Sequence, residues 1–145
     1  MSTYLFLANL VSTLAMAGAI WIVQVVHYPL FARVGGDGFA AYEVEHASRI
    51  TYVVAPLMLA ELATSALLLW VRPAGMPREA VWVGLCLVGA VWVSTFALQV
   101  PLHSALARGF DAKAHSALVL TNWVRTAAWT ARGLLLVWVA ARTMG

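Results

Sequence analysis

Long apolar runs separated by short polar stretches organise this chain. A helix needs about 20 predominantly apolar residues to cross a bilayer, and runs of this kind occur four times. The predicted helices cover roughly 4–28, 40–71, 79–101 and 115–141. Short connections favour antiparallel neighbours. The pattern predicts an all-α fold: a four-transmembrane-helix antiparallel bundle, with both termini on the same side and residues 1–145 forming one membrane domain.

The composition agrees with an integral membrane protein. Of the 145 residues, 63% are hydrophobic and 10% are charged, which excludes an ordinary soluble domain. The net charge of +3 is small and scattered, so we expect no nucleic-acid partner. The single cysteine, Cys86, excludes an intrachain disulfide and a cysteine-based zinc site. The first apolar run lacks a basic leader and a small-residue cleavage site, so we expect it to be retained as a helix.

We therefore expect a multi-pass protein of the bacterial inner membrane that contacts the lipid bilayer. The basic residues divide four to three between the two faces, which leaves the orientation open. Arg132 and Arg142 are expected at the membrane interface, with their apolar stems in the bilayer. The sequence is compatible with a homo-oligomer.

The polar residues gather at one end of the predicted bundle. All four histidines lie at helix ends next to the first and third connections: His27, His46, His103 and His115. The same end also holds Gln24, Glu43, Arg49 and Gln99. Ionisable residues within membrane segments are costly and usually mark a functional site. We expect the chemistry at this end.

Helical phase predicts that these residues face one another. At about 100° per residue, Glu43 and Glu61 project in the same direction, and His46 lies about 60° away. On the last helix, Asn122 and Trp129 share one stripe at a spacing of seven residues. The first and third helices carry similar stripes, with Gln24 on the first and with Gln99 and His103 on the third. Lipid would penalise polar stripes, so the four stripes should meet inside the bundle.

Glu61 and Arg125 are the two opposite charges placed deepest in the predicted helices. Glu61 lies roughly 20 Å beyond Ser48, and Arg125 roughly 13 Å beyond Ser116, at about 1.5 Å per residue. We predict that they form a buried ion pair at the floor of a cavity open toward the histidines. The alternative is a purely structural pair that locks the bundle.

The histidines and Glu43 suggest a metal site. Glu43-x-x-His46 places a carboxylate and an imidazole one helical turn apart, as in carboxylate-bridged metal bundles. His27, His46, His103 and Glu43 are the predicted ligands of a transition metal, iron or copper ahead of zinc. The alternative cofactor is haem b, held by two axial histidines.

Other polar residues are predicted to support this centre. Glu61, Arg125 and His115 are the candidate catalytic residues, with His115 as a further ligand or proton carrier. The candidate cofactor-binding residues are Gln24, Gln99, Asn122, Trp129 and Arg49. Without a metal, the imidazoles would serve as general bases toward a phenolic substrate.

Three short motifs carry a resemblance to a known family. "HYPLF" closes the first helix, "PLHSAL" follows the third, and "NWVRTAAW" lies in the fourth. Together they resemble the anthrone oxygenase-like family of small four-helix membrane proteins. The resemblance implies oxidation of a lipophilic aromatic substrate by molecular oxygen. His103 stands where an asparagine is more usual in that family, and the Glu43/His46 pair is not one of its features.

The preferred hypothesis is a metal- or haem-dependent oxidoreductase or oxygenase acting on a lipophilic, aromatic or quinone-like substrate. The alternative is a small proton- or anion-coupled transporter or channel that uses Glu61 and Arg125. A pore requires polar residues over the full membrane depth, whereas the far half of each helix is almost wholly apolar. A scaffold that binds partner helices through small residues such as Gly84 and Gly89 would not require four clustered histidines.

Overall fold

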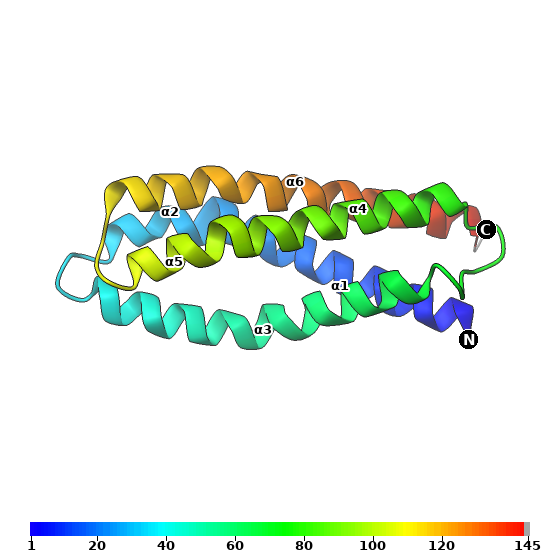
Figure 1. The fold of residues 1–145 in the computed structure, drawn as a ribbon, viewed down its shortest axis with the longest axis horizontal. Coiled ribbons are helices and arrows are strands. Elements are labelled where there is room, and N and C mark those ends of the chain that lie inside the picture. The colour runs from blue at the N-terminus through cyan, green and yellow to red at the C-terminus, as the bar shows by residue number, and fades with distance from the viewer. Residues whose placement is uncertain (144–145) are drawn as a thin grey trace.

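The computed structural model describes residues 1–143, which form helices joined by short connections and contain no strand. The chain forms four helical rods (Figure 1). The first contains α1 (Ser2–Ile22), η1 (Val23–His27), α2 (Tyr28–Leu30) and η2 (Phe31–Arg33), and the second is α3 (Phe39–Leu67). The third contains α4 (Arg78–Ser94), η3 (Thr95–Gln99) and α5 (Val100–Leu106), and the fourth is α6 (Ala112–Thr143). The start of α1 and the last turns of α6 lie at the same end of the bundle (Figure 1).

Two of the rods continue past the prolines at which we predicted that they end. Proline removes a backbone donor, and its ring crowds the carbonyl group four residues earlier. A five-residue π-helix precedes each proline: Val23–His27 before Pro29, and Thr95–Gln99 before Pro101. The wider turn relieves this crowding, so the first rod reaches Arg33 and the third reaches Leu106.

Three of the rods are long and apolar enough to cross a membrane: Ser2–Arg33, Phe39–Leu67 and Arg78–Leu106. The rods also expose large apolar side chains to their surroundings, as expected for contact with a bilayer; Tyr52 on α3 is 79% exposed and Leu120 on α6 is 71% exposed. The fourth rod, α6, spans 32 residues but contains Arg125 and Arg132. Both arginines are buried, because α6 packs against α4 and α1.

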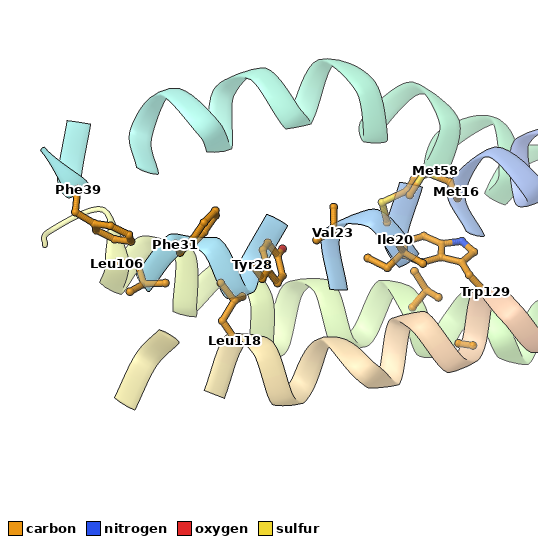
Figure 2. Close-up of a cluster of buried hydrophobic side chains, with 12 residues drawn as sticks. Met16, Ile20, Val23, Tyr28, Phe31, Phe39, Met58, Leu106, Leu118 and Trp129 are labelled. Carbon is orange, nitrogen blue, oxygen red and sulfur yellow. The ribbon is translucent and has the colours of Figure 1, made fainter. Parts of the chain in front are cut away.

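The apolar core runs along the axis of the bundle. Phe39 and Leu106 begin it beside the two short connections, and Met16 and Trp129 continue it toward the middle (Figure 2). A separate cluster around Phe6 fills the end that carries the termini. The core holds the rods together and separates two groups of buried polar side chains.

Candidate functional site

A chain of hydrogen bonds links all four rods toward the histidine end of the bundle. His103 Nδ1 bonds to a carboxylate oxygen of Glu43, which is fully buried. The other ring nitrogen of His103 lies 2.9 Å from the hydroxyl group of Tyr28. Arg125 Nη2 donates to the same hydroxyl oxygen at 3.2 Å. We call these four residues, Glu43, His103, Tyr28 and Arg125, the relay.

The chemistry of the donors gives the relay one direction. A guanidinium only donates, so the Tyr28 oxygen accepts from Arg125 and the Tyr28 proton points to His103 Nε2. A carboxylate only accepts, so His103 Nδ1 carries its proton toward Glu43. A proton that moves from Tyr28 to His103 would leave an imidazolium beside Glu43 and a phenolate beside Arg125. Both charges would then face a partner of opposite sign.

Arg125 is a buried cation without an acidic partner. It is 8% exposed. The ion pairs found in residues 1–143 are Arg49–Glu45 and Arg132–Glu61, while the neutral His103 ring only hydrogen-bonds to Glu43. Besides Tyr28, Arg125 binds only neutral acceptors: the Asn122 side-chain oxygen at 2.9 and 2.6 Å, and Thr95 at 3.5 Å. A buried charge is costly unless it is paired, so this site favours an electronegative ligand atom.

Two amides hold Arg125 in place. Asn122 uses its oxygen for Arg125 and donates through Nδ2 to the Gln24 oxygen at 2.8 Å. Gln24 in turn donates to the backbone oxygen of Val119 at 3.1 Å. Gln24 belongs to the π-helical turn η1, so the distortion before Pro29 helps to place this amide. The structure thus brings together Gln24, Asn122 and Arg125 as the sequence predicted.

The relay lies against a cavity of about 390 Å³ enclosed by all four rods. Its polar end is formed by Tyr28, Thr95, Gln99, His103 and Arg125. Its apolar walls include Met16, Ile20, Val23, Met58 and Trp129, whose side chains converge in Figure 2. Apolar walls with a few convergent polar groups are typical of small-molecule sites, and the volume falls within their usual range.

The four predicted metal ligands come together as two pairs. His27 Nε2 lies 2.9 Å from His46 Nδ1, and His103 bonds to Glu43. The His46 and His103 rings are 5.7 Å apart. Two atoms of this group, His46 Nε2 and Glu43 Oε2, are buried without a hydrogen-bond partner.

In this arrangement the predicted ligands contact one another and do not surround a common point. The ring nitrogens of His103 are both engaged, and those of His27 and His46 that face each other leave no space for an ion between them. Within residues 1–143, no group of three or more His, Cys, Asp or Glu side chains is arranged to hold a metal. Two histidines in direct contact equally leave no room for a haem iron between them. The metal and the haem stay predictions.

The remaining predicted residues lie around the cavity or outside it. Gln99 lines the cavity and is held by Ser94 at 3.0 Å. His115 anchors the backbone oxygen of Tyr28 at 2.8 Å and does not join the relay. Arg49 is exposed and forms a surface ion pair with Glu45, an interaction that contributes little.

The predicted Glu61–Arg125 ion pair is wrong: Glu61 binds Arg132 instead. Arg132 Nε donates to Glu61 Oε1 at 2.9 Å. Arg132 is 2% exposed, so its predicted interfacial position is also wrong. The axial depth explains both errors, since Arg132 lies roughly 24 Å beyond Ser116 and matches the roughly 20 Å depth of Glu61 better than Arg125 does.

The Glu61–Arg132 pair is satisfied by neutral neighbours. Glu61 accepts from Thr13 at 2.7 Å and from the Trp129 indole at 2.9 Å. Arg132 Nη2 donates to Asn9 at 2.9 Å and to Ser65 at 2.6 Å. Neither charge lines the cavity, which meets this cluster at the Trp129 ring. The geometry is that of a structural ion pair that holds α3 and α6 together.

Tyr28 and Arg132 are the important residues that the sequence analysis missed. Tyr28 stands in the "HYPLF" motif beside His27, so the motif itself was the available signal. Arg132 follows Arg125 by seven residues on one stripe of α6, and this spacing marks it as a second inward-facing charge.

Comparisons with known proteins add no relative: no family model, curated protein or solved structure matches the chain significantly. The resemblance to the anthrone oxygenase-like family stays a prediction.

Proposed function

We propose that the protein is a membrane-embedded oxidoreductase that binds a lipophilic aromatic substrate in the cavity and promotes its oxidation by molecular oxygen. The relay is the observation that carries this proposal. Three of its four members, Tyr28, His103 and Arg125, line one apolar cavity. Such a site suits a substrate that is mostly hydrocarbon and becomes negatively charged at one oxygen.

The relay supplies a general base. The substrate class is a phenol, or a ketone whose methylene group lies between aromatic rings. Tyr28 takes the substrate proton while its own proton passes to His103 Nε2, and Glu43 balances the imidazolium. The substrate keeps the electron pair of the broken bond as an enolate or phenolate. Arg125 stabilises the oxygen that carries this charge, as a preorganised cation in a water-poor site.

Oxidation of the methylene substrate then balances without an external reductant. The deprotonated carbon gives electrons to O₂ in one-electron steps and forms a carbon–oxygen bond, and protonation yields a hydroperoxide. Loss of water converts the hydroperoxide to a ketone. One oxygen atom enters the product and the other leaves as water, so O₂ takes up the four electrons that the methylene group loses. The protein contributes the base, the oxyanion partner and the apolar enclosure.

The same proposal places α6 as a fourth membrane-spanning helix, with both termini on one side of a bacterial inner membrane. Two observations support it. Arg125 and Arg132, which lower the hydropathy of α6, face protein, and the start of α1 and the last turns of α6 lie at the same end of the bundle (Figure 1). The transporter alternative rested on a Glu61–Arg125 pair, and that contact is absent from the ion pairs of residues 1–143.

Oxygen consumption by the purified protein in lipid nanodiscs tests the proposal. The substrate is a three-ring diaryl ketone with a central methylene group, and the ketone product is quantified by chromatography. General base catalysis typically contributes 10²- to 10⁴-fold, so we expect His103→Ala to lower the rate about 100-fold or more. Glu43→Gln and Tyr28→Phe should also lower it.

Glu79→Gln is the matched control for Glu43→Gln, because Glu79 is exposed at the opposite end of the bundle. The thermal unfolding midpoint of each variant is measured from its helical signal, and oxidation rates are compared between variants with equal midpoints. Wild-type protein that does not accelerate oxygen consumption, or His103→Ala protein as active as wild type, would contradict the proposal.

A further inference from the structure

The cavity reaches the outer surface of the bundle between α3 and α5. Six residues form this part of the lining: Val44, Ala47 and Thr51 from α3, Val100 and Ser104 from α5, and Ala107 directly after α5. We call them the portal. Val44 is 57% exposed and Val100 is 45% exposed, and Thr51 and Ser104 are also exposed. Side chains that line the cavity therefore also form the surface.

The surface around the portal is suited to contact with lipid. Tyr52 beside Thr51 is 79% exposed, and Phe96 on the third rod is 61% exposed. Toward the histidine end, the apolar surface gives way to the exposed Glu45–Arg49 ion pair. The portal thus spans the boundary between a charged rim and an apolar band, which corresponds to the headgroup boundary of a bilayer.

A second depression continues from the portal onto the surface of α3. Its lining includes Glu45, Ser48, Arg49 and Tyr52, and it shares Val44 and Ala107 with the cavity. A molecule lying at the membrane interface would find polar contacts outside, small side chains at the opening, and Arg125 at the inner end.

We propose that the cavity exchanges its ligand directly with the bilayer through the portal. The ligand is a membrane-dissolved ring compound with one oxygen-bearing pole, which enters first and faces Arg125 and Tyr28. This inference rests on the proposed function for the identity of the pocket, but not for the reaction performed there. To the proposed function, the portal adds that the substrate comes from the bilayer and that its oxygen-bearing end enters the cavity first.

A lipid acyl chain is the competing occupant, and the polar end of the cavity disfavours it. A phospholipid headgroup would stay at the rim, so the acyl chain would enter with its methyl end first. That end would then lie against Arg125, His103 and Tyr28, and it would offer nothing to the unpaired guanidinium. A ring compound with a phenol or carbonyl oxygen satisfies the same group.

Narrowing the portal tests this route through binding kinetics. The probe is a monohydroxyanthraquinone, and the protein is held in nanodiscs. Rapid mixing of the nanodiscs with probe-loaded vesicles gives the association rate, and mixing of probe-loaded nanodiscs with probe-free vesicles gives the dissociation rate. Both are followed by the absorbance change of the probe. Ala47→Trp and Ser104→Trp place bulk on opposite sides of the opening. Both should slow association and dissociation by about tenfold or more while the Kd changes little, because a narrowed route raises the barrier in both directions.

Leu120→Trp is the matched control, since Leu120 is 71% exposed on α6 and does not line the cavity. It should leave both rates at the wild-type value. If a tryptophan variant fails to fold, Ala47→Leu and Ser104→Leu replace it in the same measurement. Wild-type rates in folded portal variants would overturn the inference and indicate entry from the aqueous end of the bundle.

Two further outcomes separate this inference from the proposed function. If the portal variants change the binding rates of the probe but the protein consumes no oxygen, the portal inference is supported and the proposed function is contradicted. Turnover with a kcat/KM that the portal variants do not change would contradict the portal alone. Native mass spectrometry that finds a phospholipid retained in place of the probe would overturn the ring ligand in favour of an acyl chain.

Discussion

Neutralising one member of the Glu61–Arg132 pair is expected to destabilise the bundle strongly. Glu61→Gln preserves the shape of the side chain and leaves the Arg132 guanidinium buried without its carboxylate. Arg132→Met preserves the aliphatic stem and leaves the carboxylate buried without its cation. The two residues are 1% and 2% exposed, so water cannot replace the lost partner.

The magnitude follows from the neighbours that remain. Removing one partner of a buried ion pair costs about 3–5 kcal/mol in soluble proteins, whereas hydrogen bonds between membrane helices average about 0.6 kcal/mol. Glu61 would keep Thr13 and Trp129 as donors, and Arg132 would keep Asn9 and Ser65 as acceptors. We therefore expect each single variant to lose about 2–4 kcal/mol of unfolding free energy. The double variant should lose about 2 kcal/mol less than the sum.

Unfolding in detergent, followed by circular dichroism, gives the four free energies of the cycle. The matched cycle pairs Glu61→Gln with Arg125→Met. Arg125 lies two helical turns from Arg132 and makes no contact with Glu61, so these losses should add to within about 0.5 kcal/mol. A larger coupling of Glu61 to Arg125 than to Arg132 would refute the assignment of the ion pair and the axial register that produces it.

Two further outcomes follow from close contacts. Gly84→Ala would place a methyl group 2.6 Å from Arg132 Nη1, whereas Gly89 has open space; we expect Gly84→Ala to lower the thermal midpoint and Gly89→Ala to preserve or raise it. Equal midpoints would show that the guanidinium moves aside freely. Because His27 and His46 bind each other, elemental analysis of purified protein should find less than one iron, copper or zinc per chain. Stoichiometric metal that disappears in His46→Ala would instead establish the predicted metal centre.

The convergence of polar stripes could be predicted from helical phase alone. Glu43, Gln24, Asn122 and Arg125 were expected to point into the bundle, and the structure places them in one hydrogen-bonded region. Lipid offers no hydrogen bonds, so a polar side chain on an apolar helix must point toward other parts of the protein. The direction of each side chain is therefore strongly constrained by the sequence.

The pairing along the axis could not be predicted in the same way. Arg125 and Arg132 have nearly the same phase on α6, so the phase does not say which one meets Glu61. The answer depends on how far α3 and α6 slide past each other, which packing decides. The helix ends near the prolines were also not predictable. The apolar pattern around Pro29 and Pro101 is the same whether the helix stops there or continues through a π-helical turn.

The different surroundings of Arg125 and Arg132 on α6 explain why Arg132 stabilises the fold and Arg125 is available to a ligand. Arg132 has a carboxylate at 2.9 Å from Nε and two neutral acceptors for Nη2, so an added anion would compete with an existing partner. Arg125 has neutral acceptors only, and it lines the cavity. Burying a cation in this way weakens the empty protein, and an electronegative ligand atom recovers that cost on binding. The bundle thus places its direct charge pair beyond the cavity, and inside the cavity it leaves Arg125, whose direct partners are all neutral.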